Sequence, residues 1–146
     1  MLKQMIMVAG LLLSPGLLAE QSLSMVRIEI TGLDQDHGDV FIAVYDSKDQ
    51  WLGENTVADK HVDIARSKDG PVVRAELQLP PGRYAFSLFH DVNGNGELDT
   101  NFIGMPKEPI ALSNNVKARF GPPKFADAVF ELGAEPVVQS IDMTRL

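Results

Sequence analysis

The sequence lacks cysteine altogether, so no disulfide, thiolate metal site, cysteine nucleophile or cysteine-linked lipid can form. Basic residues are scarce, with 13 Lys and Arg against 20 Asp and Glu, and the formal net charge is −7. No run of Lys or Arg exceeds two residues, which argues against nucleic acid and anionic lipid as partners. The single tryptophan, Trp51, is either a binding residue or an anchor at the edge of the core, and the anchor is favoured.

Motifs of common enzymes are missing as well. The chain has no G-x-S-x-G, no H-E-x-x-H and no glycine loop that would cradle phosphate. His90 adjoins Asp91, which allows a hydrolase hypothesis, but strand alternation puts His90 on the face of Leu88 and favours a structural histidine. Asp91 and Asp99 also allow a glycosidase hypothesis, yet two carboxylates in one tight loop are more typical of cation ligands. The sequence therefore predicts a non-enzymatic protein.

The only long apolar run lies at the start of the chain, over residues 5–13. Lys3 precedes it, and a Pro15-Gly16 break and Ala19 follow, which is the layout of a signal peptide over residues 1–19. The run is shorter than the roughly 20 residues that span a bilayer, so we expect no membrane anchor in the mature form. Removing Lys3 leaves 12 cations against 20 acids, a net charge of −8. We expect one exported domain, residues 20–146, periplasmic or secreted.

Residues 20–146 show mostly the period-two alternation of β-strands. Strands are predicted at 26–33 and 40–46, which would form a first hairpin, and at 74–79, 83–90, 127–132 and 136–144. Residues 47–70 give a mixed signal, and residues 91–126 are rich in Gly, Pro and Asn. No long amphipathic helix occurs. The prediction is an all-β fold: a single antiparallel β-sandwich of about seven strands, Greek-key and Ig-like or transthyretin-like, with a long irregular loop region 91–126.

The loop after the strand at 83–90 resembles a twelve-residue calcium loop, D-x-[DN]-x-[DN]-G-x5-E. Alternate positions carry oxygen-bearing groups that could turn toward one cation: Asp91, Asn93, Asn95, Glu97 (through its backbone carbonyl) and Asp99. The twelfth position is Phe102 instead of a bidentate Glu, and no helix precedes the loop, so it is not an EF-hand. Weak calcium binding is one hypothesis, and a polar turn built on Asn and Gly is the other.

Several residues outside this spacing are auxiliary candidates for metal binding or for ordering the loop. Glu108 and Asp127 could supply the missing oxygens, and His90 and Asn101 flank the motif. The side-chain amides of Asn101, Asn114 and Asn115 could satisfy backbone groups that belong to no strand ladder.

Together these motifs resemble the bacterial secreted domain-of-unknown-function family 2141. Its pattern includes P-G-x-Y, then H-D-x-N-x-N-G-x-L-D-T-N-x-x-G-x-P-K-E, then S-N-N and G-P-P-x-F-x-D-A. The matching positions are Pro81, Gly82 and Tyr84, residues 90–108, residues 113–115 and residues 121–128. The resemblance implies a small exported β-sandwich similar to transthyretin-like and carboxypeptidase-regulatory modules, and it implies no activity.

The resulting hypothesis is an exported, non-enzymatic β-sandwich module whose long loop is ordered by calcium or by its own amides. On this interpretation residues 99–109 and 120–128 cross the same end of the sandwich, with Phe102 and Phe125 as hydrophobic clips and Lys107 and Glu108 at the rim. The alternative is a carbohydrate- or peptide-binding module that uses the 91–126 loop end. The partner is then an extracytoplasmic protein or a carbohydrate.

Overall fold

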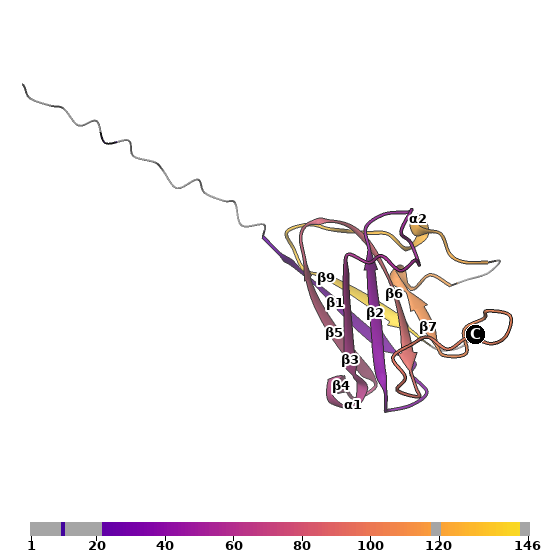
Figure 1. Cartoon of the computed structure of the whole chain (residues 1–146). Helices are drawn as coiled ribbons and strands as arrows, with labels where there is room; N and C mark the ends of the chain where they lie inside the picture. Colours follow the sequence, from indigo (N-terminus) through magenta and orange to yellow (C-terminus); the bar gives the residue numbers. More distant parts are fainter. Residues whose placement is uncertain (1–9, 11–21, 118–120, 144–146) are drawn as a thin grey trace, which may run out of the picture.

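The computed structural model describes residues 10, 22–117 and 121–143. The predicted signal peptide, residues 1–19, lies outside the described residues except for Gly10. Two β-sheets pack face to face (Figure 1). No helix of the described part is long and apolar enough to cross a membrane.

The first sheet has the strand order β4-β5-β1-β9, and the second has the order β3-β2-β6-β7, with β8 paired to the start of β6. The strands of the first sheet are β4 (Lys68–Asp69), β5 (Val72–Leu79), β1 (Ser24–Thr31) and β9 (Val137–Asp142). Those of the second are β3 (Ala58–Asp63), β2 (Asp39–Tyr45), β6 (Gly82–Asp91), β7 (Ile110–Leu112) and β8 (Phe130–Leu132). Three short helices complete the described fold: α1 (Ile64–Ser67), η1 (Ser113–Asn115) and α2 (Phe125–Ala128).

Alternation along the strands builds the core. In β1, β2 and β5 every second residue is buried and the residues between them are more exposed. The inward side chains of the two sheets meet in one hydrophobic cluster, whose fully buried members include Ile28, Ile42, Phe86, Leu88 and Ile141. The two prolines before Gly82 end β5 and allow the chain to cross to the second sheet, because proline cannot donate to a ladder.

The mostly-strand architecture confirms the all-β prediction, and three details of it were wrong. β1 and β9 pair in parallel, so the sandwich is not purely antiparallel. The described residues contain nine strands rather than about seven, because the mixed stretch 47–70 supplies both β3 and the two-residue β4 and the region 91–126 supplies β7. β1 and β2 do not form a hairpin, since they lie in different sheets.

The region 91–126 is not one irregular loop. Its middle forms β7 and η1, and β7 pairs with β6 through Ser87, Leu88 and Phe89. β7 therefore divides the region into a loop of residues 91–109 and a later segment. Antiparallel pairing sets Asp39 of β2 against Asp91 of β6, so loop 91–109 leaves the sandwich at that end. α2 lies at the opposite end of β6, near the top of Figure 1.

Candidate functional site

Loop 91–109 begins where β6 ends and returns to the second sheet at β7. Its two ends are joined, because the His90 backbone N–H donates to the carbonyl of Pro109 over 3.0 Å. A second bond, from Lys107 N to the carbonyl of Asp99 over 2.8 Å, and a bridge between Thr100 and Pro106 continue the pairing outward. The loop is therefore a closed, hydrogen-bonded projection from one end of the sandwich.

The carboxylate of Asp91 organises the first half of the loop. Its Oδ1 accepts from Gly94 N at 3.1 Å and its Oδ2 accepts from Gly96 N at 2.8 Å. The residue is only 2% exposed, so the two backbone donors replace water around a buried charge. Both glycines have a positive φ, +72° and +76°, a backbone conformation in which most other residues would be strained.

Asn93 and Asn95 hold the turn from the other side. Each side-chain oxygen accepts from the backbone N–H two residues on, over 3.3 Å and 3.0 Å, in successive Asx-type turns. Each amide nitrogen donates to Asp99, from Asn95 to Oδ1 at 2.7 Å and from Asn93 to Oδ2. The side chains at positions 3, 5 and 9 of the predicted calcium loop are thus brought together.

The two amide donors stabilise the ionised form of the Asp99 carboxyl group. The pKa of its carboxyl group lies below the usual value, first because the Asn95 amide donates to it. Hydrogen bonding with Glu108, the Asn93 amide and the positive charge of Lys107 act in the same direction. Asp99 is therefore held as an anion.

Glu108 closes the loop. Its Oε2 accepts from Val92 N at 2.8 Å, and its Oε1 accepts from Asp99 N at 3.1 Å. The side chain is 9% exposed, so it is not the rim residue that the sequence suggested. One carboxylate ties the two strands of the loop together across its base.

The outer part of the loop is a tight turn organised by Asn101. Its side-chain oxygen accepts from both Ile103 N and Met105 N at 3.0 Å, and its backbone N–H donates to the carbonyl of Met105 at 2.8 Å. Gly104, with φ of +81°, completes the turn. The backbone N–H groups of Asn101, Ile103, Gly104 and Met105 all find their acceptors within the turn itself.

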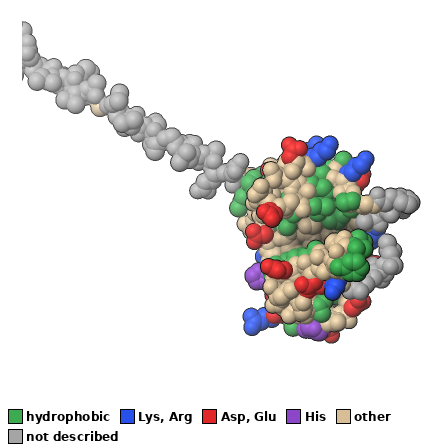
Figure 2. Space-filling view, turned by 45° about the vertical axis from the view of Figure 1, so that its right-hand side comes forward, with side chains coloured by type: hydrophobic (Ala, Val, Ile, Leu, Met, Phe, Trp, Pro, Cys, Tyr) green, Lys and Arg blue, Asp and Glu red, His purple; other side chains and the backbone are tan. Residues whose placement is uncertain are grey.

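This turn holds three large apolar side chains in solvent, and we call them the apolar tip: Phe102, Ile103 and Met105. They are 98%, 68% and 57% exposed. Phe102 is therefore not a hydrophobic clip, and the prediction that placed it there was wrong. Figure 2 brings forward the side of the molecule on which the loop projects, and hydrophobic side chains are visible there among acidic and basic ones.

Two of the auxiliary candidates are not gathered at the loop. His90 points into the sandwich, on the opposite face from Asp91, and its ring is fully buried with Nε2 2.8 Å from the carbonyl oxygen of His37. Its Nδ1 is the one buried side-chain polar atom of the described residues that has no hydrogen-bond partner. Asp127 lies in α2, at the other end of the sandwich. The loop thus combines Glu108 and Asn101 with the five motif residues.

The donor set suits calcium only in part. Both oxygens of Asp91 already accept backbone bonds, and Asn93 and Asn95 turn their NH₂ groups, not their oxygens, toward Asp99. Within residues 22–117 and 121–143, no three His, Asp or Glu side chains are grouped as metal ligands. A cation would need both amides to rotate and would find few charged oxygens.

The S-N-N motif, residues 113–115, and Trp51 make hydrogen bonds around α2, at the end of the sandwich opposite loop 91–109. Buried Ser113 accepts from Phe86 N at 3.0 Å. Asn114 donates to the carbonyl of Asp127 in α2 at 3.2 Å and to that of Val129 directly after α2 at 2.9 Å. Trp51 donates from Nε1 to the carbonyl of Pro123 at 2.9 Å and packs edge-on against Phe125. The segments with Phe102 and Phe125 therefore cover opposite ends, contrary to the prediction that they cover the same end.

The apolar tip is the feature that the sequence interpretation missed. A signal for it exists, because Phe102, Ile103 and Met105 cluster within four residues of a loop that is rich in Asn, Gly and acidic residues. The motif residues around them, Asn101 and Gly104, form the turn that directs them outward.

Comparison with curated proteins and with solved structures gives no match. A family described as "Uncharacterized protein conserved in bacteria (DUF2141)" matches residues 28–140, which include most of both sheets and the whole of loop 91–109. The resemblance suggested by the sequence motifs is thereby confirmed, and the chain belongs to this uncharacterised bacterial family.

Proposed function

We propose that the protein is an exported, non-enzymatic recognition module that presents the apolar tip to a partner protein. One observation carries the proposal: Phe102 is 98% exposed on a turn whose own hydrogen bonds fix it. Exposing three large apolar side chains on a well-ordered turn is unfavourable in water, and such patches commonly mark interaction sites. A turn that is already ordered also loses less conformational entropy on binding.

The shape of the tip favours a protein pocket as its receptor. Three neighbouring apolar side chains on one projecting turn form a convex surface, which complements a concave apolar site. A carbohydrate would instead require an exposed ring flanked by polar groups for the sugar hydroxyls, whereas the exposed neighbours of Phe102 at the tip, Ile103 and Met105, are apolar. The net charge of −7 and the anionic Asp99 beside the tip disfavour an anionic membrane surface.

The non-enzymatic part of the proposal is supported by the burial of His90 and Asp91. A general base must come within hydrogen-bond reach of its substrate, and neither side chain is accessible. Export is supported by the composition of residues 1–19, and the mature N-terminus is then expected near Glu20. N-terminal sequencing of the extracytoplasmic protein tests export, and intact Met1 on a cytoplasmic product contradicts it.

Site-specific photocrosslinking tests the function of the tip. A photoreactive phenylalanine analogue replaces Phe102 in one variant and Val138, an exposed apolar residue of β9, in the control. We expect a discrete crosslinked protein from position 102 and not from position 138. The purified crosslinked partner should bind the domain saturably, and Phe102→Ser should weaken that binding about tenfold or more. Equal crosslinking from both positions, or unchanged affinity of Phe102→Ser, contradicts the proposal.

We propose weak calcium binding as a second function of the same loop. The supporting observation is that Asn93 and Asn95 converge on Asp99, while Asp91 lies at the base of the same turn. Few charges and no bidentate Glu favour a dissociation constant of about 10⁻⁴–10⁻³ M. At a hundredfold excess of calcium, binding would stabilise the fold by about 2.7 kcal/mol.

Thermal melts in about 10 mM calcium and in chelator, with magnesium as the control, measure this stabilisation. We expect an increase of several degrees that Asp91→Ala or Asp99→Ala abolishes. Glu97→Ala should keep the increase, because position 7 offers its backbone carbonyl. Identical melts would leave loop 91–109 ordered by its own hydrogen bonds alone.

A further inference from the structure

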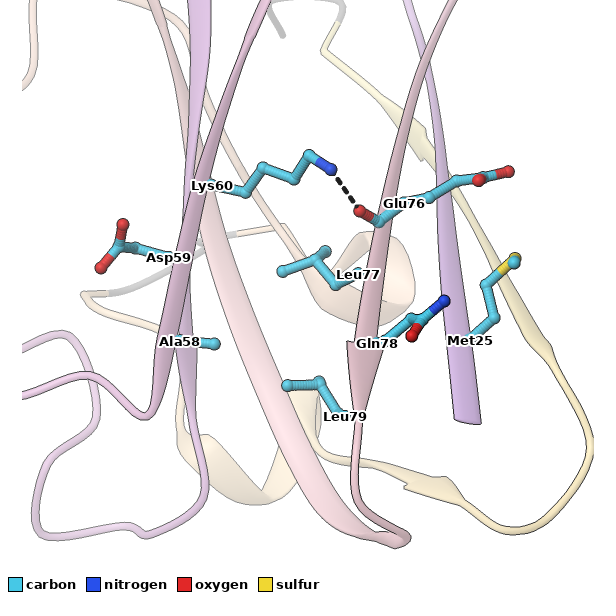
Figure 3. A pocket seen from close by; sticks show the side chains of 8 residues that line it. All are labelled: Met25, Ala58, Asp59, Lys60, Glu76, Leu77, Gln78 and Leu79. Atoms are coloured by element: carbon cyan, nitrogen blue, oxygen red, sulfur yellow. Dashed lines mark hydrogen bonds between the residues drawn. The ribbon is translucent and has the colours of Figure 1, made fainter. Parts of the chain in front are cut away.

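An open groove runs along the side of the sandwich where β3 and β5 face each other. It has a volume of about 470 Å³ and is lined by Met25, Ala58, Asp59, Lys60, Glu76, Leu77, Gln78 and Leu79. Figure 3 shows Leu77, Leu79 and Ala58 pointing into the space between the two strands. The groove therefore has an apolar floor between two strand edges, away from loop 91–109.

One wall of the groove is a strand edge that is only partly covered. β4 pairs with β5 through Val72 and Val73 alone, whereas β1 pairs with β5 along its length to Leu79. From Arg74 to Leu79, β5 thus has a ladder on one side only. Backbone N–H and C=O groups of an antiparallel strand alternate between its two edges, so those of Arg74, Glu76 and Gln78 face the open edge.

Lys60 confirms this direction and supplies the one charge that points into the groove. Its ammonium donates to the backbone carbonyl of Glu76 over 2.6 Å. The Glu76 carboxylate points away and pairs with Arg27 at 2.9 Å, and Asp59 also points away (Figure 3). Among the described residues the ammonium therefore has a carbonyl partner and no carboxylate.

We propose that this groove binds an extended peptide segment that adds a strand to the free edge of β5 and carries a carboxylate for Lys60. Added strands lie about 4.8 Å from their neighbour, which places the peptide along the line that the two-residue β4 leaves open. Main-chain bonds to Glu76 and Gln78 give affinity, and apolar side chains over Leu77 and Leu79 give selectivity. The Lys60 ammonium then exchanges a neutral carbonyl for a charged acceptor, which is the stronger bond.

The charge of Lys60 favours an acidic peptide over a second copy of the chain as the occupant of the groove. An edge-to-edge pair of two copies would bring two Lys60 ammonium groups to one interface, while the carboxylates of Asp59 and Glu76 point away from each groove (Figure 3). Edge lysines also protect natural sheets against such pairing. A peptide with an acidic residue satisfies the cation and covers the apolar floor.

Direct binding of synthetic peptides tests the proposal. The probes are fluorescein-labelled peptides of about ten residues, alternating Val and Thr, with blocked termini and either Glu or Gln at the centre. We expect the Glu peptide to bind about tenfold or more tightly than the Gln peptide. Lys60→Met should reduce this preference to less than about twofold, whereas Lys48→Met, the matched loss of an exposed lysine outside the groove, should keep it.

A second variant tests the strand edge itself. Gln78→Pro removes an outward N–H while leaving the β1 ladder, because proline is tolerated on open edges. We expect both peptides to bind it about tenfold or more weakly, with an unchanged near-ultraviolet spectrum as evidence of folding. Phe102→Ser should have no effect, which separates this site from the tip. Failure of the Glu peptide to saturate the protein below about 1 mM, or equal binding of that peptide by Gln78→Pro and the wild type, overturns the proposal. A dimer that Gln78→Pro dissociates would overturn it too, and would assign the edge to a second copy.

Discussion

Replacing Glu108 by Gln should loosen loop 91–109 and destabilise the domain. The substitution keeps the size of a 9% exposed side chain, but it removes the charge and turns one acceptor oxygen into an NH₂ group. Either Val92 N or Asp99 N then faces a donor instead of an oxygen. The perturbation therefore breaks one of two bonds and weakens the other.

The expected magnitude follows from the kind of bond that is lost. A hydrogen bond to a charged group contributes about 1.5–3 kcal/mol to stability, and a buried donor left without a partner adds to the loss. We expect the free energy of unfolding to fall by about 2–3 kcal/mol. In a domain of this size, that change lowers the melting temperature by about 6–15 °C.

Thermal unfolding and amide hydrogen exchange measure the two parts of this prediction. The exchange rates of Val92 and Asp99 should rise more than those of β1, because the broken bond is local. Glu97→Gln is the matched control, since it removes the same charge from an exposed side chain of the same loop. If Glu108→Gln melts within a degree or so of the wild type, and its exchange is unchanged, the carboxylate does not hold the loop.

Three further substitutions probe the same architecture. Gly38 has a φ of +85°, and a Cβ there would overlap the carbonyl oxygen of Asp91, so Gly38→Ala should lower stability by more than about 2 kcal/mol in a denaturant titration. Ser113→Ala leaves Phe86 N and the carbonyl of Ala128 without their buried partner, and should cost about 2–4 kcal/mol in the same assay, whereas Ser140→Ala at an exposed position of β9 should be nearly neutral. The folded-state pKa of Asp99 lies below its usual 3.8, so its stabilising contribution is complete well above that pH and is lost as the pH falls through the folded pKa. Acid titrations of stability should therefore be shallower for Asp99→Asn than for the wild type.

Alternation of buried and exposed residues was enough to predict most of the strands. β1, β2, β5, β6 and β9 begin and end within about two residues of the predicted segments, because each buries one face and contains few breakers. The parallel pairing of β1 with β9 could not be predicted in the same way. It joins the two ends of the domain, and no local pattern specifies which distant strand becomes a neighbour.

The loop shows a similar division. The spacing of Asp91, Asn93, Asn95 and Asp99 identified side chains that converge in the structure. The hydrogen-bond partners of these side chains depend on how the chain folds in three dimensions. The same holds for Glu108 and Asp127, of which the first closes the loop and the second lies far from it in α2. The exposure of the tip was missed because apolar residues are ordinarily expected in a core.

The central claim is that loop 91–109 is ordered by its own hydrogen bonds and holds the apolar tip in place without a ligand. Backbone ¹⁵N relaxation of the domain in chelator measures this order directly on the fast timescale. We predict order parameters of about 0.85 for Asn101, Ile103 and Met105, equal to those of the core strands. Values below about 0.6 at these residues would contradict the claim, because the tip would then be a flexible chain with no fixed surface to present.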